Sequence, residues 1–474
     1  MNMEKKALNY LDKNTNILTS LAKDIWDHPQ DGLEETYASK LISDKLEEAG
    51  FSVKRDVGYM PTAFLASWGV KRPIIGILGE YDALPGISQK VSSKKEAVIE
   101  GGFGHGCGHN LLGVGSLGAA LAVKEVMEKN KIKGTIRYYG CPAEETLVGK
   151  VFMAKYGVFD DLDGAITWHP MYANTVWNSS SLAMNSFKFN FHGVSAHASD
   201  LGVGRSAFDA AILTDIGINY LRDNIMPEAR IHGVITNGGL QPNILPPYAQ
   251  SWYYVRAPHR DQVKEIYQRV LDIAKGATLM TGTTSDVEFI VGCYDYLPND
   301  IIGEVILEKL NKIGPPKFTN KEKSFAKELK SKVSPDIVKD TLKTYGLTRE
   351  AIGEPLSEKI VYELGGFAKG DLINKSTEVG DVSYITPTAQ LTTCCMPLGV
   401  GVHTWQAVAS CGSTIGFKGM VLAAKTMALT VLDLMVKPKI LKAAFAEFKK
   451  KTDGKRYISP IPKSLISPIK KFGN

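Results

Sequence analysis

The sequence has few of the features that mark secreted or membrane proteins. Its 474 residues include only six cysteines, whose spacing shows no disulfide framework, and two of them, Cys394 and Cys395, are adjacent. The segment Met1–Trp26 carries charges throughout and lacks the apolar stretch of a signal peptide. The most apolar stretch near the C-terminus, Gly419–Val436, is interrupted by two charged residues, which argues against a membrane span. We therefore expect a protein of the reducing cytoplasm with no membrane partner.

The sequence also has little net charge outside its C-terminal segment. The formal net charge is +6, but residues 437–474 contain eleven Lys or Arg and two acidic residues, so the rest of the chain carries −3. The few aromatic residues of this basic segment are not regularly interleaved with its charges, as a nucleic-acid-binding segment would favour. We interpret the segment as a solvated tail and expect no nucleic-acid partner.

The length and the hydrophobic pattern predict two structural units, because a single core stops growing at roughly 250–300 residues. In residues 1–182, strand-like runs alternate with helical patterns, which predicts an α/β domain with a mostly parallel sheet and helices on both faces. Residues 183–291 predict an inserted α+β domain, and residues 292–474 return to the first domain and end in the basic tail. The expected strands are 63–68, 74–79, 135–140 and 165–168, and the expected long helices are 110–130 and 419–435.

The strongest chemical signal is the segment Gly104-His105-Gly106-Cys107-Gly108-His109-Asn110. Cys107 and His109 would project to the same side of an extended segment, and thiolate and imidazole are good ligands for zinc and related ions. The segment leads into a predicted helix, so it lies at the carboxyl end of the sheet, where open α/β proteins place their sites. The alternative is a glycine-rich turn with a structural histidine.

Three further segments place polar side chains at predicted strand ends or glycine-rich junctions. Glu144 and Glu145 follow the strand 135–140 and are either a solvated turn or a pair in which one binds metal and the other takes a proton. His169 and His403 could each be an ordinary structural histidine. A structural zinc site would need four closely spaced Cys or His ligands, whereas these dispersed mixed ligands suit a catalytic site with two metal ions.

Other candidate residues have weaker support. Asp82 ends a predicted strand and could orient a ligand imidazole, although a turn-forming Asp is nearly as good an interpretation. In the inserted domain, His197 could donate to a developing oxyanion, and Arg256 suits carboxylate recognition. Asn243 is polar among turn residues. An ordinary structural role stays open for each of these three.

Taken together, these segments resemble the metallopeptidase family of aminoacylases and glutamate carboxypeptidases, in its cysteine-containing amidohydrolase branch. They run in order along nearly the whole chain: GEYDALPG (79–86), GHGCGHN (104–110), PAEE (142–145), WHP (168–170), GVSAHAS (193–199), PNILP (242–246), GDVSYITPTAQ (380–390) and GVHTWQ (401–406). Within the branch they are most similar to hydrolases of p-aminobenzoyl-glutamate. Many members carry a His-x-Asp ligand motif where this sequence reads Glu80-Tyr81-Asp82, so the assignment of each ligand to each metal stays open.

The resemblance implies a role for each candidate residue. Two divalent ions, zinc or manganese, would be bound by five ligands: Cys107, His109, Glu145, His169 and His403. Glu144 would be the general base, and Asp82 would support the ligands. His197 would reach the active site of the partner subunit in a homodimer, while Asn243 and Arg256 would hold the substrate carboxylate. The resemblance also allows a related A-type subunit.

The expected function is therefore hydrolysis of the amide bond of an N-acyl amino acid by a metal-activated water. In this reading the first domain is the catalytic domain, and the insertion is a lid and dimerisation domain. The favoured substrate is p-aminobenzoyl-glutamate. Three alternatives remain: a dipeptidase for small or basic dipeptides, a catalytically silent binding subunit, and a structural zinc protein.

Overall fold

The predicted α/β alternation is present in the structure, a computed structural model that describes residues 3–200, 202–344, 355–362 and 365–469. The largest sheet has seven strands in the order β1-β2-β4-β3-β5-β13-β6. Its four central strands are parallel: β4 (Thr135–Cys141), β3 (Ile74–Glu80), β5 (Gly164–Met171) and β13 (Thr388–Cys394). The edge strands β1 (Ser52–Arg55), β2 (Phe64–Gly69) and β6 (Thr175–Trp177) pair antiparallel. A mostly parallel central sheet confirms the predicted fold class.

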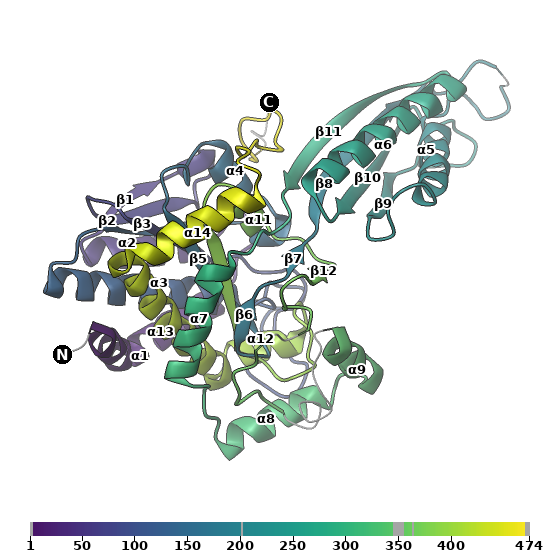
Figure 1. Cartoon of the computed structure of the whole chain (residues 1–474). Helices are drawn as coiled ribbons and strands as arrows, with labels where there is room; N and C mark the ends of the chain where they lie inside the picture. The colour runs from purple at the N-terminus through teal and green to yellow at the C-terminus, as the bar shows by residue number, and fades with distance from the viewer. Residues whose placement is uncertain (1–2, 201, 345–354, 363–364, 470–474) are drawn as a thin grey trace.

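Helices lie on both faces of this sheet (Figure 1). Tyr138 and Tyr139 of β4 point to opposite faces because side chains alternate along a strand. The Tyr138 hydroxyl donates to the carbonyl of Gly113 in α3 (His109–Asn130) at 3.0 Å, and α3 packs against α1 (Met3–Asp27) and α13 (Thr414–Val436). The Tyr139 ring packs on Phe159, which follows α4 (Gly149–Lys155), on the opposite face.

The core is built around α3 and α13. Both helices are long and apolar enough to cross a membrane by length and composition alone, yet 83% of each apolar window is buried inside the protein. Close packing is aided by small residues in α3: a Cβ on Gly115 would lie 2.8 Å from the Trp168 ring of β5. These two helices therefore behave as core helices of the fold. All six cysteines are free, in keeping with a spacing that shows no disulfide framework, and all six are buried.

A second, four-stranded sheet has its own hydrophobic core. It is antiparallel throughout, in the order β11 (Thr284–Cys293), β8 (Ala183–His192), β10 (Tyr248–Ala257) and β9 (Arg230–Asn237). Phe187, Phe189 and Phe191 face the helices α5 (Ala207–Arg222) and α6 (Arg260–Thr281). On the open face, Trp252 Nε1 donates to Ser186 Oγ at 2.9 Å. This sheet projects away from the large one (Figure 1); we call it the lid sheet.

Shorter elements complete the fold. They are α2 (Thr36–Glu48), α7 (Asp300–Ile313), α8 (Asn320–Lys330), α9 (Pro335–Thr344), α11 (Val379–Ser383), α12 (Trp405–Cys411), η1 (Val57–Tyr59), η2 (Glu144–Thr146) and the paired strands β7 (Ser180–Ser181) and β12 (Leu372–Ile373). The segment predicted as a solvated tail begins with the helix α14 (Pro438–Lys451), so that prediction is wrong there. Ala444 of α14 is fully buried and its carbonyl accepts a hydrogen bond from Asn299, because α14 packs against α7 and α13.

Candidate metal centre

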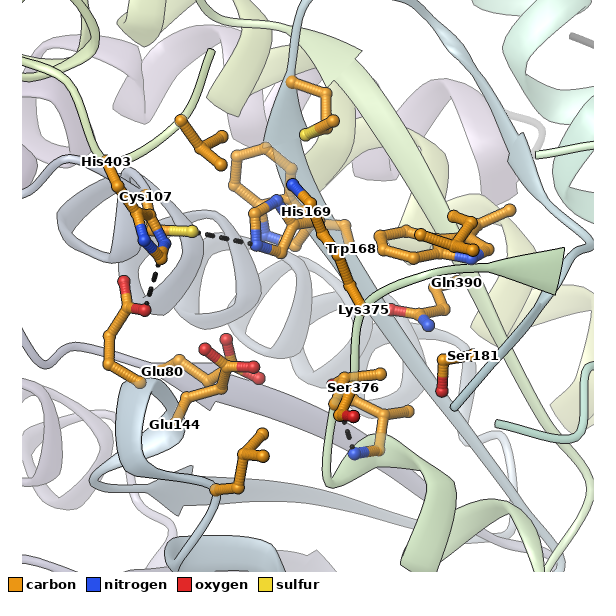
Figure 2. A pocket seen from close by; sticks show the side chains of 18 of the residues that line it. Glu80, Cys107, Glu144, Trp168, His169, Ser181, Lys375, Ser376, Gln390 and His403 are labelled. Atoms are coloured by element: carbon orange, nitrogen blue, oxygen red, sulfur yellow. Dashed lines mark hydrogen bonds and ion pairs between the residues drawn. The ribbon is translucent and has the colours of Figure 1, made fainter. Parts of the chain in front are cut away.

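The carboxyl ends of the parallel strands open onto a cavity of about 360 Å³ (Figure 2). Glu80 ends β3, Glu144 and Glu145 follow β4, and His169 lies near the end of β5. Parallel strands bring their carboxyl ends to one edge of a sheet, which gathers residues that lie far apart in the sequence. The lining residues that carry the chemistry discussed below are Glu80, Cys107, Glu144, Glu145, His169, Trp177, Arg256, Lys375 and His403.

The five predicted metal ligands form two groups that share Cys107. In the first group, Cys107 Sγ lies 3.4 Å from His169 Nε2, and His109 completes the set. In the second, His403 Nε2 lies 3.1 Å from a carboxylate oxygen of Glu145. Within each group the potential ligand atoms all lie within 4.8 Å of one another. One shared thiol between two sets of ligands is an arrangement that suits two adjacent cations.

Glycines on either side of Cys107 let the backbone enter this crowded place. A Cβ on Gly106 would lie 2.5 Å from Ile87 Cδ1 and 3.1 Å from the Cα atom of His403. Gly108 directly precedes α3, and its φ of +77° lies in the left-handed region, which glycine adopts more easily than other residues. The His403 backbone N–H donates to the Gly106 carbonyl at 3.0 Å, so the two ligand loops are hydrogen-bonded to each other.

The turn η2 that carries Glu144 and Glu145 is held by two buried carboxylates. The backbone N–H of Ala143, whose φ of 54° is unfavourable for a non-glycine residue, donates to Glu35 Oε1 at 2.7 Å. The N–H of Glu145 donates to Asp82 Oδ2 at 2.9 Å. Glu35 and Asp82 therefore stabilise a strained turn and fix the direction in which its two glutamates point.

The histidine tautomers are set by the neighbouring acceptors. A carboxylate and a carbonyl can only accept, so His109 Nδ1–H donates to Asp82 (2.8 Å) and His169 Nδ1–H donates to the Pro170 carbonyl (2.9 Å). Both Nε2 atoms are left for the centre. Burial, and then the positive charge of His109, lower the pKa of His169 to about 3, so its ring is neutral, the form that binds metal. Burial opposes charge on His109 as well, but Asp82 outweighs it and raises the pKa of His109 well above its usual value, so a cation that binds Nε2 would have to displace a proton from it.

These residues fit divalent metal ions. His109 Nε2, Glu145 Oε1 and Glu80 Oε2 are buried without a hydrogen-bond partner. Each such atom costs about 1–3 kcal/mol of stability, and a cation placed among them would remove that cost. Thiolate, imidazole and carboxylate are the donor types of catalytic zinc and manganese sites. Neutral His169 and these three unpartnered atoms can therefore serve as ligands.

Glu144 lies beside the ligands without belonging to either of the two groups. Its Oε2 atom is 3.7 Å from His109 Nε2. Burial first, and then the negative charges of Glu80 and Glu378, raise the pKa of Glu144 well above its usual range. A carboxyl group in these surroundings can take up a proton and release it again, which is the property a general base needs.

The three predicted lid residues are divided between two places. Arg256, at the end of β10, lines the cavity, and its buried Nε lacks a hydrogen-bond partner. His197 and Asn243 do not line it. Their two loops lie side by side, since the Ala198 N–H donates to the Asn243 carbonyl at 3.0 Å, and both side chains are exposed.

Sequence reasoning missed several residues of the cavity. Lys375 is exposed there and extends toward His169 (Figure 2), whose pKa it helps to lower. Trp177 lies edge-on to His169, with ring centroids 6.2 Å apart. Glu80 was visible in the sequence, because it stands where many family members have a ligand histidine. Its buried partner Lys150 carried no signal, since a lysine in a helix is normally solvated.

Comparisons with known proteins agree with this site. A model of the peptidase family M20/M25/M40 matches residues 76–339. Over 462 residues the chain is 40% identical to the B subunit of p-aminobenzoyl-glutamate hydrolase of Escherichia coli (strain K12), a match that covers 95% of this chain and 96% of that one. It is 27% identical over 482 residues to Xaa-Arg dipeptidase of Homo sapiens, covering 97% of this chain and 95% of the dipeptidase.

The fold is also found among solved structures. The crystal structure of a dinuclear metal-binding peptidase of the M20 family from Bacillus subtilis matches with a TM-score of 0.57. The match covers 90% of this chain and 99% of that one at 14% sequence identity. The likeness in fold therefore extends over most of the chain.

Proposed function

The chain belongs to the peptidase family M20/M25/M40, and from this premise we propose that it hydrolyses the amide bond of p-aminobenzoyl-glutamate or of a closely similar N-acyl amino acid. Membership makes it a metal-dependent hydrolase of amide or peptide bonds. The single observation that carries the choice of substrate is the cavity: two cations without a described acidic partner, Lys375 and Arg256, stand in the same cavity as the metal ligands.

The cavity wall suits an acidic substrate with an aromatic part. Glutamate released from the amide carries two carboxylates, and a guanidinium and an ammonium are the groups that bind carboxylates most strongly. Trp177 offers an aromatic face to an aryl ring. The positive charges of Lys375 and Arg256 would repel the arginine side chain of an Xaa-Arg dipeptide. Dipeptidase activity is therefore the weaker of the two proposals.

The residues of the centre have distinct tasks in this reaction. Cys107, His109, His169, Glu145 and His403 would hold the ions, with Asp82 keeping His109 in the correct tautomer. Two bound divalent ions would act as Lewis acids and lower the pKa of a water molecule at the centre. Glu144 would accept the proton that this water loses while the water oxygen bonds to the carbonyl carbon. Glu144 would then pass the proton to the nitrogen of glutamate as the C–N bond breaks, which leaves p-aminobenzoate.

We propose zinc or manganese as the ions. The thiol of Cys107 and the imidazoles support zinc, while Glu145 supports manganese, because carboxylates suit that ion. We further propose that the chain works in a reducing cytoplasm, in keeping with its six free cysteines.

A homodimer would give His197 and Asn243 a role. Both are exposed on the lid, away from the cavity of their own subunit, so they could reach the centre of a partner subunit. The outer face of α5 supports this proposal, since Ile212, Ile216 and Tyr220 recur at helical spacing and are exposed, Tyr220 to 73%. There the partner subunit's His197 would donate to the developing oxyanion. The Escherichia coli relative is named as the B subunit of its enzyme, which also supports a related A-type partner.

The test is the release of p-aminobenzoate from p-aminobenzoyl-glutamate by purified protein, after chelation and after addition of zinc or manganese. We expect release only with metal. An Xaa-Arg dipeptide and p-aminobenzoyl-glutamine serve as matched substrates. Faster hydrolysis of the Arg dipeptide would overturn the proposed substrate in favour of a dipeptidase, and no hydrolysis of any of the three by metal-loaded protein would point to a missing A-type subunit.

A further inference from the structure

A lysine is fully buried beside the metal centre. Lys150 in α4 has 0% exposure. Its Nζ lies 2.5 Å from Oε1 of Glu80, at the end of β3, and 3.0 Å from Oε1 of Glu378, directly before α11. Both carboxylates are buried as well. Two buried carboxyl groups therefore share one ammonium inside the protein.

Such a trio is a poor way to stabilise a fold. Removing charges from water costs several kcal/mol for each ion, and apolar side chains of similar volume are often as stable or more stable. The trio also leaves Oε2 of Glu80 and Oε2 of Glu378 buried without hydrogen-bond partners. Stability alone therefore does not explain the trio, and the groups next to Glu80 offer another reason for it.

Glu80 faces the ligands. Its second oxygen, Oε2, lies 3.4 Å from His109 Nε2, the ring atom that Asp82 leaves free. Ligand-type atoms of Glu80, His109 and Glu144 lie within 4.8 Å of one another, and Figure 2 shows the two carboxylates side by side. One oxygen of Glu80 is thus held by Lys150 while the other points into the space that the ions would occupy.

We propose that Lys150 and Glu378 are positioning residues that fix Glu80 as an additional anionic group of the metal centre, next to His109. The Lys150 ammonium holds Oε1 of Glu80, and Oε1 of Glu378 holds the same ammonium. Without the ammonium, Oε1 of Glu80 would lose its ion-pair partner and Glu80 would lose its fixed orientation. The proposal rests on the metal centre and not on which amide is cut.

The experiment compares two buried lysines. In Lys150→Met we expect the affinity for zinc, measured by competition with a chelator, to fall roughly tenfold to a hundredfold, as when partners of metal ligands are removed. The matched control is Lys309→Met. Lys309 is 1% exposed and is held by Glu4 and Asp433, but it joins α1, α7 and α13 instead of the cavity. The control should lose stability and keep its zinc affinity.

A second variant separates positioning from general destabilisation and is available if Lys150→Met fails to fold. Glu80→Gln keeps the volume and should weaken zinc binding by a similar factor. If Lys150 acts through Glu80, the double variant binds zinc no more weakly than Glu80→Gln alone. Additive losses, or a wild-type zinc affinity in either single variant, would overturn the proposal. Zinc affinity is read without substrate, so these outcomes are independent of the substrate proposed above.

Discussion

The large sheet and the lid sheet place their polar side chains in different ways. The parallel strands of the large sheet end at one edge, so Glu80, Glu145 and His169 reach a single cavity from three different strands. The antiparallel lid strands end alternately at opposite ends, and of the lid residues that the structure describes only Arg256 lines that cavity. Strand direction therefore decides which of these residues meet at one edge of a sheet.

The two regions also differ in burial. Near the large sheet, Glu80, Asp82 and His109 are almost completely buried, and Oε2 of Glu80 and Nε2 of His109 lack hydrogen-bond partners. On the lid, His197 and Asn243 are exposed and lie in connecting loops. A buried, poorly satisfied set of ligands suits a preformed cation site, whereas exposed loop residues suit contact with another molecule.

The largest expected effect is in the large-sheet region. We expect Glu144→Gln to lower kcat roughly 10²–10⁴-fold, because it removes the proton acceptor. Metal content, measured by elemental analysis, should stay at the wild-type level. The control Glu145→Gln should instead lose metal, since it removes a ligand. Loss of metal from the Glu144 variant would contradict its assignment as base.

The second effect tests the lid region. We expect His197→Ala to lower kcat roughly 10²–10³-fold, as the loss of an oxyanion donor does. If His197 serves the partner subunit, mixing this variant with Glu144→Gln under subunit exchange builds one intact centre in each mixed dimer. Activity should then recover to about a quarter of the wild-type value. An unchanged low activity in the mixture, with exchange verified by mass, would place the role of His197 within its own subunit or exclude it.

The smallest effect concerns the cavity wall between the two regions. We expect Lys375→Met to raise KM about tenfold for p-aminobenzoyl-glutamate and to leave KM for p-aminobenzoyl-glutamine nearly unchanged, because only the first offers a second carboxylate. Lys188→Met is the control, since Lys188 stacks on Trp252 at 5.0 Å on the lid sheet. Equal KM changes with both substrates would show that Lys375 does not read the side-chain carboxylate.

Much of the fold could be predicted because its elements follow simple periodicities. The strand predicted at 74–79 is β3 (Ile74–Glu80), and the helix predicted from residue 110 is α3, which begins at His109. The strand β13 was not predicted, although it is buried along its whole length. Its threonines look polar, but Thr392 and Thr393 donate to backbone carbonyls of neighbouring segments, which lets a polar sequence form a central strand.

The kinds of ligand and the strand ends at which they stand can be read from the amino-acid sequence, because glycines, histidines and paired glutamates leave local signatures. Which distant side chains meet depends on the folded chain. Lys150 of α4 donates a hydrogen bond to Glu378, 228 residues further along the chain, and it also contacts Glu80 at the end of β3. No local pattern records that contact, since it depends on strand order and on the face that each helix covers, and both are set by packing of the whole core.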